Sequence, residues 1–170
     1  EKFNPLQKFG FKSQPSSSDW NSSFVKWSFE AALKRIGAVI IFERTELVDD
    51  LMTKGISLES VPGPEVLNSI FFKESPLHDG AILIRKGKIT KASCYLPLSS
   101  QEDLPTQWGT RYRAALGLAE QCDAWVMIIS EETGEISMAK DDKVHTITDE
   151  NHLSLQVEEA VLTGKENNIE

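Results

Sequence analysis

Residues 78–96 read HDGAILIRKGKITKASCYL, and this stretch decides the fold. Two apolar segments, 81–84 and 89–96, flank the polar residues 85–88, which include the glycine that a tight turn favours. The pattern predicts an antiparallel hairpin of two β-strands. The carboxylate of Asp79 then stands at the mouth of a buried strand.

Outward from this hairpin, strands and helices alternate along the chain. Short apolar runs rich in β-branched residues predict further strands at 38–42, 125–130 and 135–138. Apolar residues spaced by three and four, together with capping residues, predict helices at 19–37, 47–54, 64–73, 110–121 and 149–163. Gly55 and Gly164 are expected to end two of these helices. The predicted fold class is α/β, a single domain with a central mixed β-sheet surrounded by helices.

The length of 170 residues and the 40% content of hydrophobic residues fit one domain with a real core. We expect an N-terminal arm or linker over 1–18, the folded domain over 19–164 and a C-terminal tail over 165–170. The net charge of -8 argues against a surface that coats nucleic acid. The longest apolar runs are too short to span a bilayer, and the two cysteines lack the spacing of a metal site. We therefore expect a cytoplasmic protein with neither a nucleic-acid nor a membrane partner.

The residues around Asp79 form the first candidate site. A carboxylate beside the imidazole of His78 can orient or deprotonate a hydroxyl, or help to hold a divalent cation. Gly80 lets the backbone approach a ligand closely. Asp-Gly is also a common turn dipeptide, so a purely structural turn remains the alternative for this motif taken alone.

The start of the predicted helix at 110 is the second candidate. Thr110 is a plausible N-cap whose hydroxyl, with the free amides that follow, can bind a phosphate. Arg111 and Arg113 add planar donors at the same end. Arginine is unfavourable near the positive end of a helix dipole, which argues for an anion there. The alternative is a capped surface helix whose arginines pair with local acids.

Two weaker signals accompany these motifs. Ser130 and Glu131 follow an apolar strand, at a position where α/β proteins commonly build sites. Tyr95 and Leu96 offer an aromatic ring and an aliphatic neighbour suited to a flat base, although a tyrosine at a strand end is more often simply packed. Neither a P-loop nor a GxGxxG motif is present.

With these residues assembled, the chain resembles a diadenylate cyclase domain of the soluble stand-alone form, a family that condenses two ATP into cyclic di-AMP. The family's DGA motif corresponds to Asp79-Gly80-Ala81, and its GTRHRAA motif to Gly109-Thr110-Arg111-Tyr112-Arg113-Ala114-Ala115. Further matches follow in the family's order at 76–78, 94–98 and 130–134, and the resemblance covers roughly residues 20–163.

The resemblance implies a homodimer or higher homo-oligomer in which two copies meet face to face, each holding one ATP. Each ribose 3′-hydroxyl would attack the α-phosphate of the other nucleotide, releasing pyrophosphate. The catalytic residues implied are Asp79, Arg111 and Arg113. The substrate-binding residues implied are Gly80, Ala81, Tyr95, Leu96, Gly109, Thr110, Tyr112 and Ser130. A divalent metal, Mg or Mn, is implied beside Asp79, His78 and Glu131.

One position departs from the family pattern, because Tyr112 stands where the central histidine is usual. A phenol donates a hydrogen bond but is not a cation at neutral pH. The alternative function is therefore a nucleotide-binding sensor of the same fold with weak or no turnover. A structural interaction domain is a third interpretation, which leaves the two arginines without a partner.

Overall fold

The computed structural model describes residues 20–166, with side chains described as far as Thr163. Seven strands within this part of the chain form one mixed sheet in the order β2-β4-β3-β1-β5-β6-β7. Strands β1 and β3 pair in parallel, and the other neighbours pair antiparallel. The strands are β1 (Ala38–Phe42), β2 (Thr53–Ser60), β3 (Ala81–Arg85), β4 (Lys88–Tyr95), β5 (Trp125–Ile129), β6 (Ile136–Lys140) and β7 (Lys143–Thr146).

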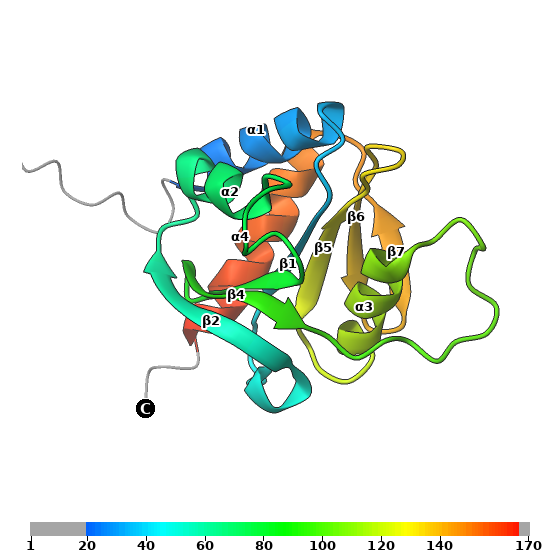
Figure 1. The fold of residues 1–170 in the computed structure, drawn as a ribbon. Coiled ribbons are helices and arrows are strands. Elements are labelled where there is room, and N and C mark those ends of the chain that lie inside the picture. The colour runs from blue at the N-terminus through cyan, green and yellow to red at the C-terminus, as the bar shows by residue number, and fades with distance from the viewer. Residues whose placement is uncertain (1–19, 167–170) are drawn as a thin grey trace, which may run out of the picture.

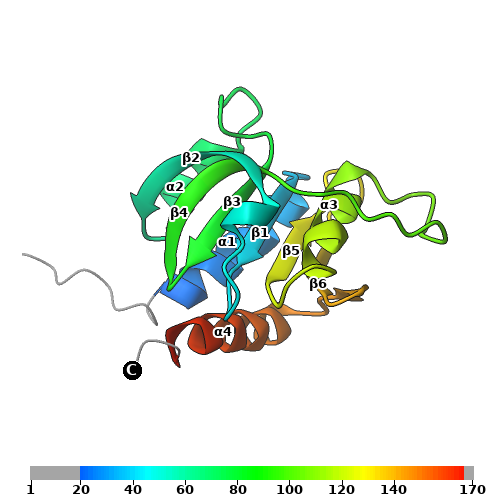
Figure 2. The same cartoon turned by 90° about the horizontal axis from the view of Figure 1, so that it is seen from below.

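Helices cover both faces of this sheet (Figures 1 and 2). Residues of α1 (Trp20–Leu33), α2 (Pro64–Phe71) and α4 (Glu150–Glu166) pack in one apolar core. Helix α3 (Thr110–Ala119) packs in a second core on the opposite face. The predicted mixed sheet surrounded by helices is therefore confirmed.

The two cores follow from the alternation of side chains along a strand. In β1, Ala38, Ile40 and Phe42 enter the first core, while Val39 and Ile41 enter the second. All five residues of β1 are buried, as are all five of β5 beside it. These central strands are continuous apolar runs because helices cover both of their faces.

The predicted hairpins are confirmed as β3–β4 and β5–β6, but the predicted helix over 47–54 is wrong. A single 3₁₀ turn, η2 (Asp49–Leu51), is followed at once by β2. The positive φ angles of Lys54 and Gly55, +58° and +116°, are not helical.

Smaller differences concern one further strand and several element ends, among them the end of α1, which finishes at Leu33 and not at Gly37. Strand β7 was not predicted, because its four residues are short and mostly exposed. Helix α4 continues past Gly164 to Glu166. Gly109, and not Thr110, is the N-cap of α3, and Thr110 is its first residue.

The strand register brings several loops to one end of the sheet, which we call the motif end. Ala81 lies opposite Cys94, Ile82 opposite Ile40, and Ala38 opposite Ile129. The starts of β3 and β1 and the finishes of β4 and β5 therefore lie side by side. Every motif singled out in the sequence adjoins one of these strand ends or the start of α3.

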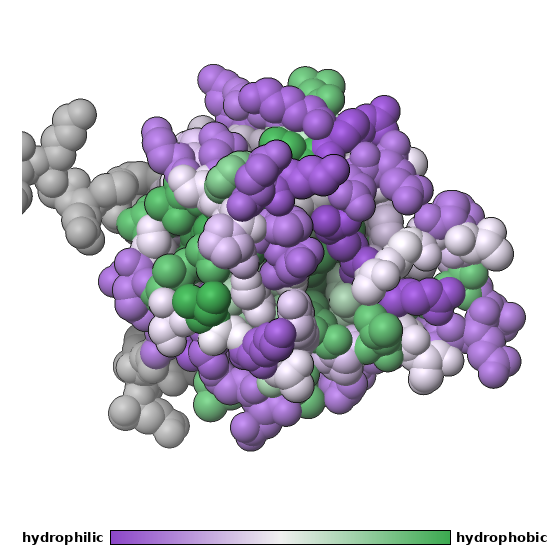
Figure 3. Space-filling model, viewed as in Figure 1, coloured by the Kyte–Doolittle hydropathy of each residue, from purple (hydrophilic) through white to green (hydrophobic). Residues whose placement is uncertain are grey.

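The surface is mostly hydrophilic on the side shown in Figure 3, with hydrophobic side chains in smaller groups between. Within residues 20–166, no helix combines the length and the apolar character needed to cross a bilayer. The predicted arm over 1–18 and residues 167–170 of the predicted tail lie outside the described residues.

Candidate functional site

The Asp79 loop joins α2 to β3 at the motif end. The Asp79 side chain is 74% exposed, and its Oδ1 lies 3.3 Å from Nε2 of His78. The other ring nitrogen of His78, Nδ1, lies 2.7 Å from the carbonyl oxygen of Ser75. A carbonyl only accepts hydrogen bonds, so we assign the proton of the neutral ring to Nδ1. Nε2 therefore faces the carboxylate, either as an N–H donor when both ring nitrogens carry a proton or with a lone pair that a cation shared with Oδ1 would satisfy.

Gly80 is required by both conformation and space. Its φ is +86°, and a Cβ there would lie 2.7 Å from the carbonyl oxygen of Cys94. Any other residue would push the loop away from β4. The Asp79 side chain is therefore exposed on a loop whose backbone packs closely against strand β4.

Arg111, in the first turn of α3, is held on two sides. Its Nη1 lies 2.9 Å from Oε1 of Glu131, in the loop after β5. The guanidinium also lies over Gly37, just before β1, where a Cβ would come within 2.6 Å of Cζ. Arg111 therefore links three segments of the motif end.

The start of α3 offers further groups to an anion. The N-cap residue Gly109 makes no side-chain capping bond, and Thr110 is exposed beside it. The Arg113 side chain is half-buried and, within the part of the chain that the structure describes, makes no hydrogen bond or ion pair. Free first-turn amides with an unpaired guanidinium form the kind of place where phosphates bind.

Tyr112 differs from its neighbours because its side chain lies inside the domain. Its ring stacks on Trp108 with centroids 5.0 Å apart, and its hydroxyl lies 3.4 Å from Oε1 of Glu135. Burial raises the pKa of the Tyr112 phenol, and the Glu135 carboxylate acts in the same direction. The phenol is therefore neutral at physiological pH.

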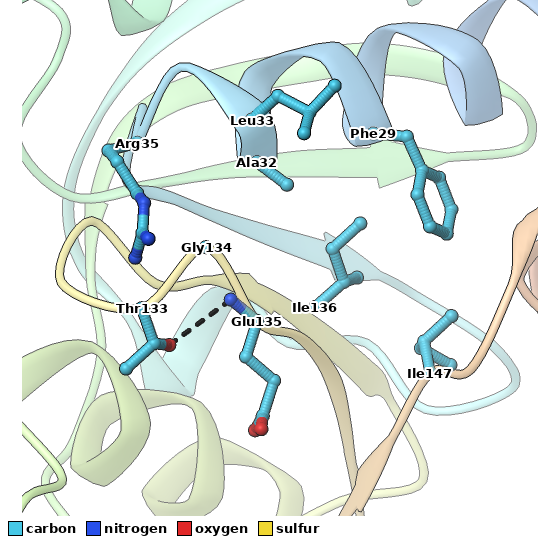
Figure 4. Close-up of a pocket in the computed structure, with 9 residues that line it drawn as sticks. All are labelled: Phe29, Ala32, Leu33, Arg35, Thr133, Gly134, Glu135, Ile136 and Ile147. Carbon is cyan, nitrogen blue, oxygen red and sulfur yellow. Dashed lines mark hydrogen bonds between the residues drawn. The ribbon is translucent and has the colours of Figure 1, made fainter.

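Ser130 holds the turn that follows β5. Its hydroxyl accepts hydrogen bonds from the backbone N–H groups of Glu132 and Thr133, at 3.3 and 3.2 Å. Arg35, after α1, donates to the carbonyl of Glu132 at 2.6 Å. Behind this turn lies a cavity of about 280 Å³ (Figure 4). Neither Asp79 nor Arg111 lines this cavity. At the motif end the side chains of Asp79 and Thr110 are exposed to solvent.

Tyr95 and Leu96, where β4 ends, border the same surface. The Tyr95 side chain is 39% exposed. The Nζ atom of Lys54, on the edge strand β2, lies 4.7 Å from the centre of the Tyr95 ring. A base placed against this ring would also meet the lysine.

Strand β5 is two positions from β3 in the sheet, and adjacent strands lie about 4.8 Å apart. The start of β3 and the finish of β5 are therefore about 10 Å apart. The structure therefore brings Asp79, Arg111 and Ser130 to one end of the sheet. The three residues expected at a metal are not gathered. Glu131 pairs with Arg111, and the described residues contain no group of three metal-ligating side chains.

Sequence reasoning missed Gly37 and Lys54 as members of this surface. The sequence pattern places Gly37 at the end of the predicted helix 19–37 and Lys54 at the end of the predicted helix 47–54. No local pattern marks either residue, because each meets its partner through long-range packing.

Comparisons with known proteins agree on one family. Residues 28–144 match the family model for DisA bacterial checkpoint controller nucleotide-binding. Cyclic di-AMP synthase CdaA of Bacillus subtilis is 42% identical over 114 residues, which are 67% of this chain and 42% of that protein. A diadenylate cyclase of Mycoplasma pneumoniae is 36% identical over 141 residues, 82% of this chain and 69% of that protein.

A solved structure gives the same result. In the crystal structure of a double mutant of DacA from Staphylococcus aureus, the matched region has a TM-score of 0.78 and 38% identity. It covers 83% of this chain and 94% of that one. The chain spans only 42% of Bacillus subtilis CdaA and 53% of CdaS from the same organism.

Proposed function

Because this chain belongs to the diadenylate cyclase family, we propose that it joins two molecules of ATP into cyclic di-AMP and two pyrophosphates. The observation that carries the proposal is the shared location of the Asp79 loop and the arginine-bearing start of α3 at the motif end. This surface is open within one chain. A second copy placed face to face would close it, with one nucleotide on each copy.

The reaction consists of two equivalent displacements. The 3′-oxygen of each ribose forms a bond to the α-phosphorus of the other nucleotide, and the bond from that phosphorus to the bridging oxygen breaks, releasing pyrophosphate. Asp79 orients the 3′-hydroxyl and accepts its proton. A two-fold symmetric pair performs both displacements with one kind of site.

The start of α3 stabilises the phosphates. Arg111, Arg113 and the free amides after Gly109 offer donors to charge that develops on the transferring phosphate. Thr110 adds a hydroxyl. Glu131 keeps the Arg111 guanidinium oriented before a nucleotide arrives.

The other side chains of the surface bind the nucleotide. Tyr95 and Leu96 border the adenine. Gly80 and Ala81 allow the backbone to approach the ribose, and Ser130 shapes the neighbouring turn. Tyr112 contributes through packing, because its hydroxyl is turned toward Glu135.

A divalent metal, Mg²⁺ or Mn²⁺, fits part of this site. The converging Nε2 of His78 and Oδ1 of Asp79 are the groups that would hold it. One carboxylate can hold Mg²⁺ or Mn²⁺ when substrate phosphates and waters supply the remaining oxygen ligands, and the imidazole would add a nitrogen ligand. When bound, the metal would neutralise charge on those phosphates. Glu131 would join it only after leaving Arg111.

ATP is supplied in the cytoplasm, and we place the activity there.

The test is product formation from ATP with Mg²⁺ or Mn²⁺. We expect the wild-type chain to form cyclic di-AMP, and Asp79→Asn to lower the rate by at least about 100-fold while ATP still binds. Asp142→Asn is the matched control, because Asp142 is an exposed acid in the turn between β6 and β7, at the opposite end of the sheet, and this variant should keep the wild-type rate. Binding of ATP by the wild-type chain without any product would contradict a cyclase and indicate a sensor.

A further inference from the structure

Ser93 interrupts the regular pairing between β4 and β3. Ala81 lies opposite Cys94, but Leu83 lies opposite Lys91, so β4 contains one extra residue between these pairs. Ser93 has a φ of +54°, in the left-handed region that non-glycine residues seldom adopt. An extra residue of this kind is a β-bulge, and bulges commonly redirect the chain beside functional sites.

The bulge contacts the Asp79 loop at two points. The Ser93 hydroxyl donates a hydrogen bond of 3.3 Å to the carbonyl of Leu77, two residues before Asp79. The Ser93 carbonyl carbon would lie 2.9 Å from a Cβ on Gly80, the residue after Asp79. Ser93 therefore touches the loop on both sides of the carboxylate.

A second serine holds the loop from within. The buried Ser75 accepts a hydrogen bond from the Leu77 N–H at its Oγ, at 3.1 Å. Leu77 is thus fixed at its N–H by Ser75 and at its carbonyl by Ser93. The Asp79 carboxylate is mostly exposed and, among residues 20–166, has His78 as its one ion-pair partner, so its direction depends on this backbone.

We propose that Ser93 is a positioning residue: it fixes the backbone of the Asp79 loop and so directs the Asp79 carboxylate toward the ribose 3′-hydroxyl. The proposal rests on the proposed function for its consequence, although the loop contacts stand independently. Misplacement by about 1 Å is enough to cost a reaction about 100-fold. Loss of the Ser93 hydroxyl should therefore affect turnover more than nucleotide binding.

The experiment compares Ser93→Gly with Thr90→Val. Glycine keeps the left-handed backbone without strain and removes only the hydroxyl and its carbon. Thr90 is the matched control, because it lies at the next register shift of β4 and its hydroxyl donates to the Leu83 carbonyl at 3.4 Å, far from Asp79. For Ser93→Gly we expect kcat to fall about tenfold with the KM for ATP within twofold of wild type. For Thr90→Val both should stay within twofold.

Hydrogen exchange separates this inference from the proposed function. In Ser93→Gly the amides of 78–81 should exchange at least about tenfold faster than in wild type and in Thr90→Val, whether or not the wild-type chain makes a cyclic product. Ser93→Ala gives the same comparison should the glycine variant fold poorly. Unchanged exchange in this segment, or an equal fall in kcat for Thr90→Val, would overturn the positioning role.

Discussion

The position of the Arg111 side chain depends on Gly37, which has no side chain. Its guanidinium occupies the space over Gly37 that a Cβ would fill, at 2.6 Å from Cζ. The atoms in conflict belong to the far end of a flexible side chain. A methyl group at position 37 would therefore move Arg111 without unfolding the domain.

We expect Gly37→Ala to raise the KM for ATP about tenfold, because a charged hydrogen bond to phosphate contributes about 1.5–3 kcal/mol. The melting temperature should change little. Steady-state kinetics and a thermal melt measure both. The control is Gly63→Ala, whose nearest neighbour would be Glu65 Oε2 at 3.6 Å, an ordinary contact. An unchanged KM in Gly37→Ala would show that Arg111 does not depend on this space.

Individual residues of the surface were predictable where they sit in motifs. Asp79, Thr110 and Arg111 were found because a carboxylate before a strand and cations at a helix start are local patterns. Gly37 and Ser93 were not, since their roles depend on residues more than ten positions away. Ser93 resembles any polar residue of a strand until its left-handed backbone is known.

Among the elements, the 3₁₀ turn η2 is fastened to the sheet by a cluster of charges. Arg85, at the finish of β3, donates to buried Glu43 at 2.6 Å and also bonds Asp49. Lys91 of β4 donates to Asp49 at 2.8 Å. The Lys91 hydrogen bond lowers the pKa of the Asp49 carboxyl, and Arg85 acts in the same direction. The pKa of Arg85 is raised in return, chiefly by Glu43.

This cluster predicts a pH-dependent loss of stability. The folded chain holds Asp49 at a lower pKa than the unfolded chain, whose value is about 3.9. The stabilisation is therefore complete above that value and disappears as pH falls through the folded pKa. We expect Asp49→Asn to lower the free energy of unfolding by up to about 1 kcal/mol at pH 7, since the side chain is partly exposed.

Urea unfolding in steps from pH 7 toward pH 3 measures the difference between wild type and Asp49→Asn. The difference should shrink below about pH 4. The neighbouring Asp50 is exposed, and Asp50→Asn should match wild type throughout. A difference that stays constant with pH would mean that Asp49 acts through its shape and not its charge.

Strand β2 shows why some elements escaped prediction. None of its residues is fully buried, and it contains Gly55. It is an edge strand, held by its hydrogen bonds with β4. The central strands β1 and β5 were recognised easily, because burial on both faces leaves a continuous apolar run in the sequence itself.

For the whole molecule, the open motif end makes the second copy part of the chemistry. Under the proposed reaction, each bond uses Asp79 of one copy and the phosphate-binding arginines of the other. Asp79→Asn and Arg111→Ala should each form little product alone. A mixed pair of the two variants retains one complete set of groups.

Mixing the two variants should therefore yield the linear dinucleotide, in which one bond is made and one triphosphate remains, and not the cyclic product. Chromatography of the nucleotides after incubation with ATP measures this. Wild-type protein mixed with itself is the control and should give the cyclic product. A mixture that forms neither product would place both groups of each bond in a single copy.

The stacked pair at the start of α3 also provides an optical signal. Of the four tryptophans, Trp20, Trp27 and Trp125 are buried at 3%, 3% and 8% exposure, whereas Trp108 is half-exposed against Tyr112 and one residue from Gly109. Fluorescence emission from the three buried tryptophans reports whether the core remains folded. We therefore expect a nucleotide that binds at the start of α3 to change the red part of the emission spectrum, so that binding can be titrated without a dye or a label.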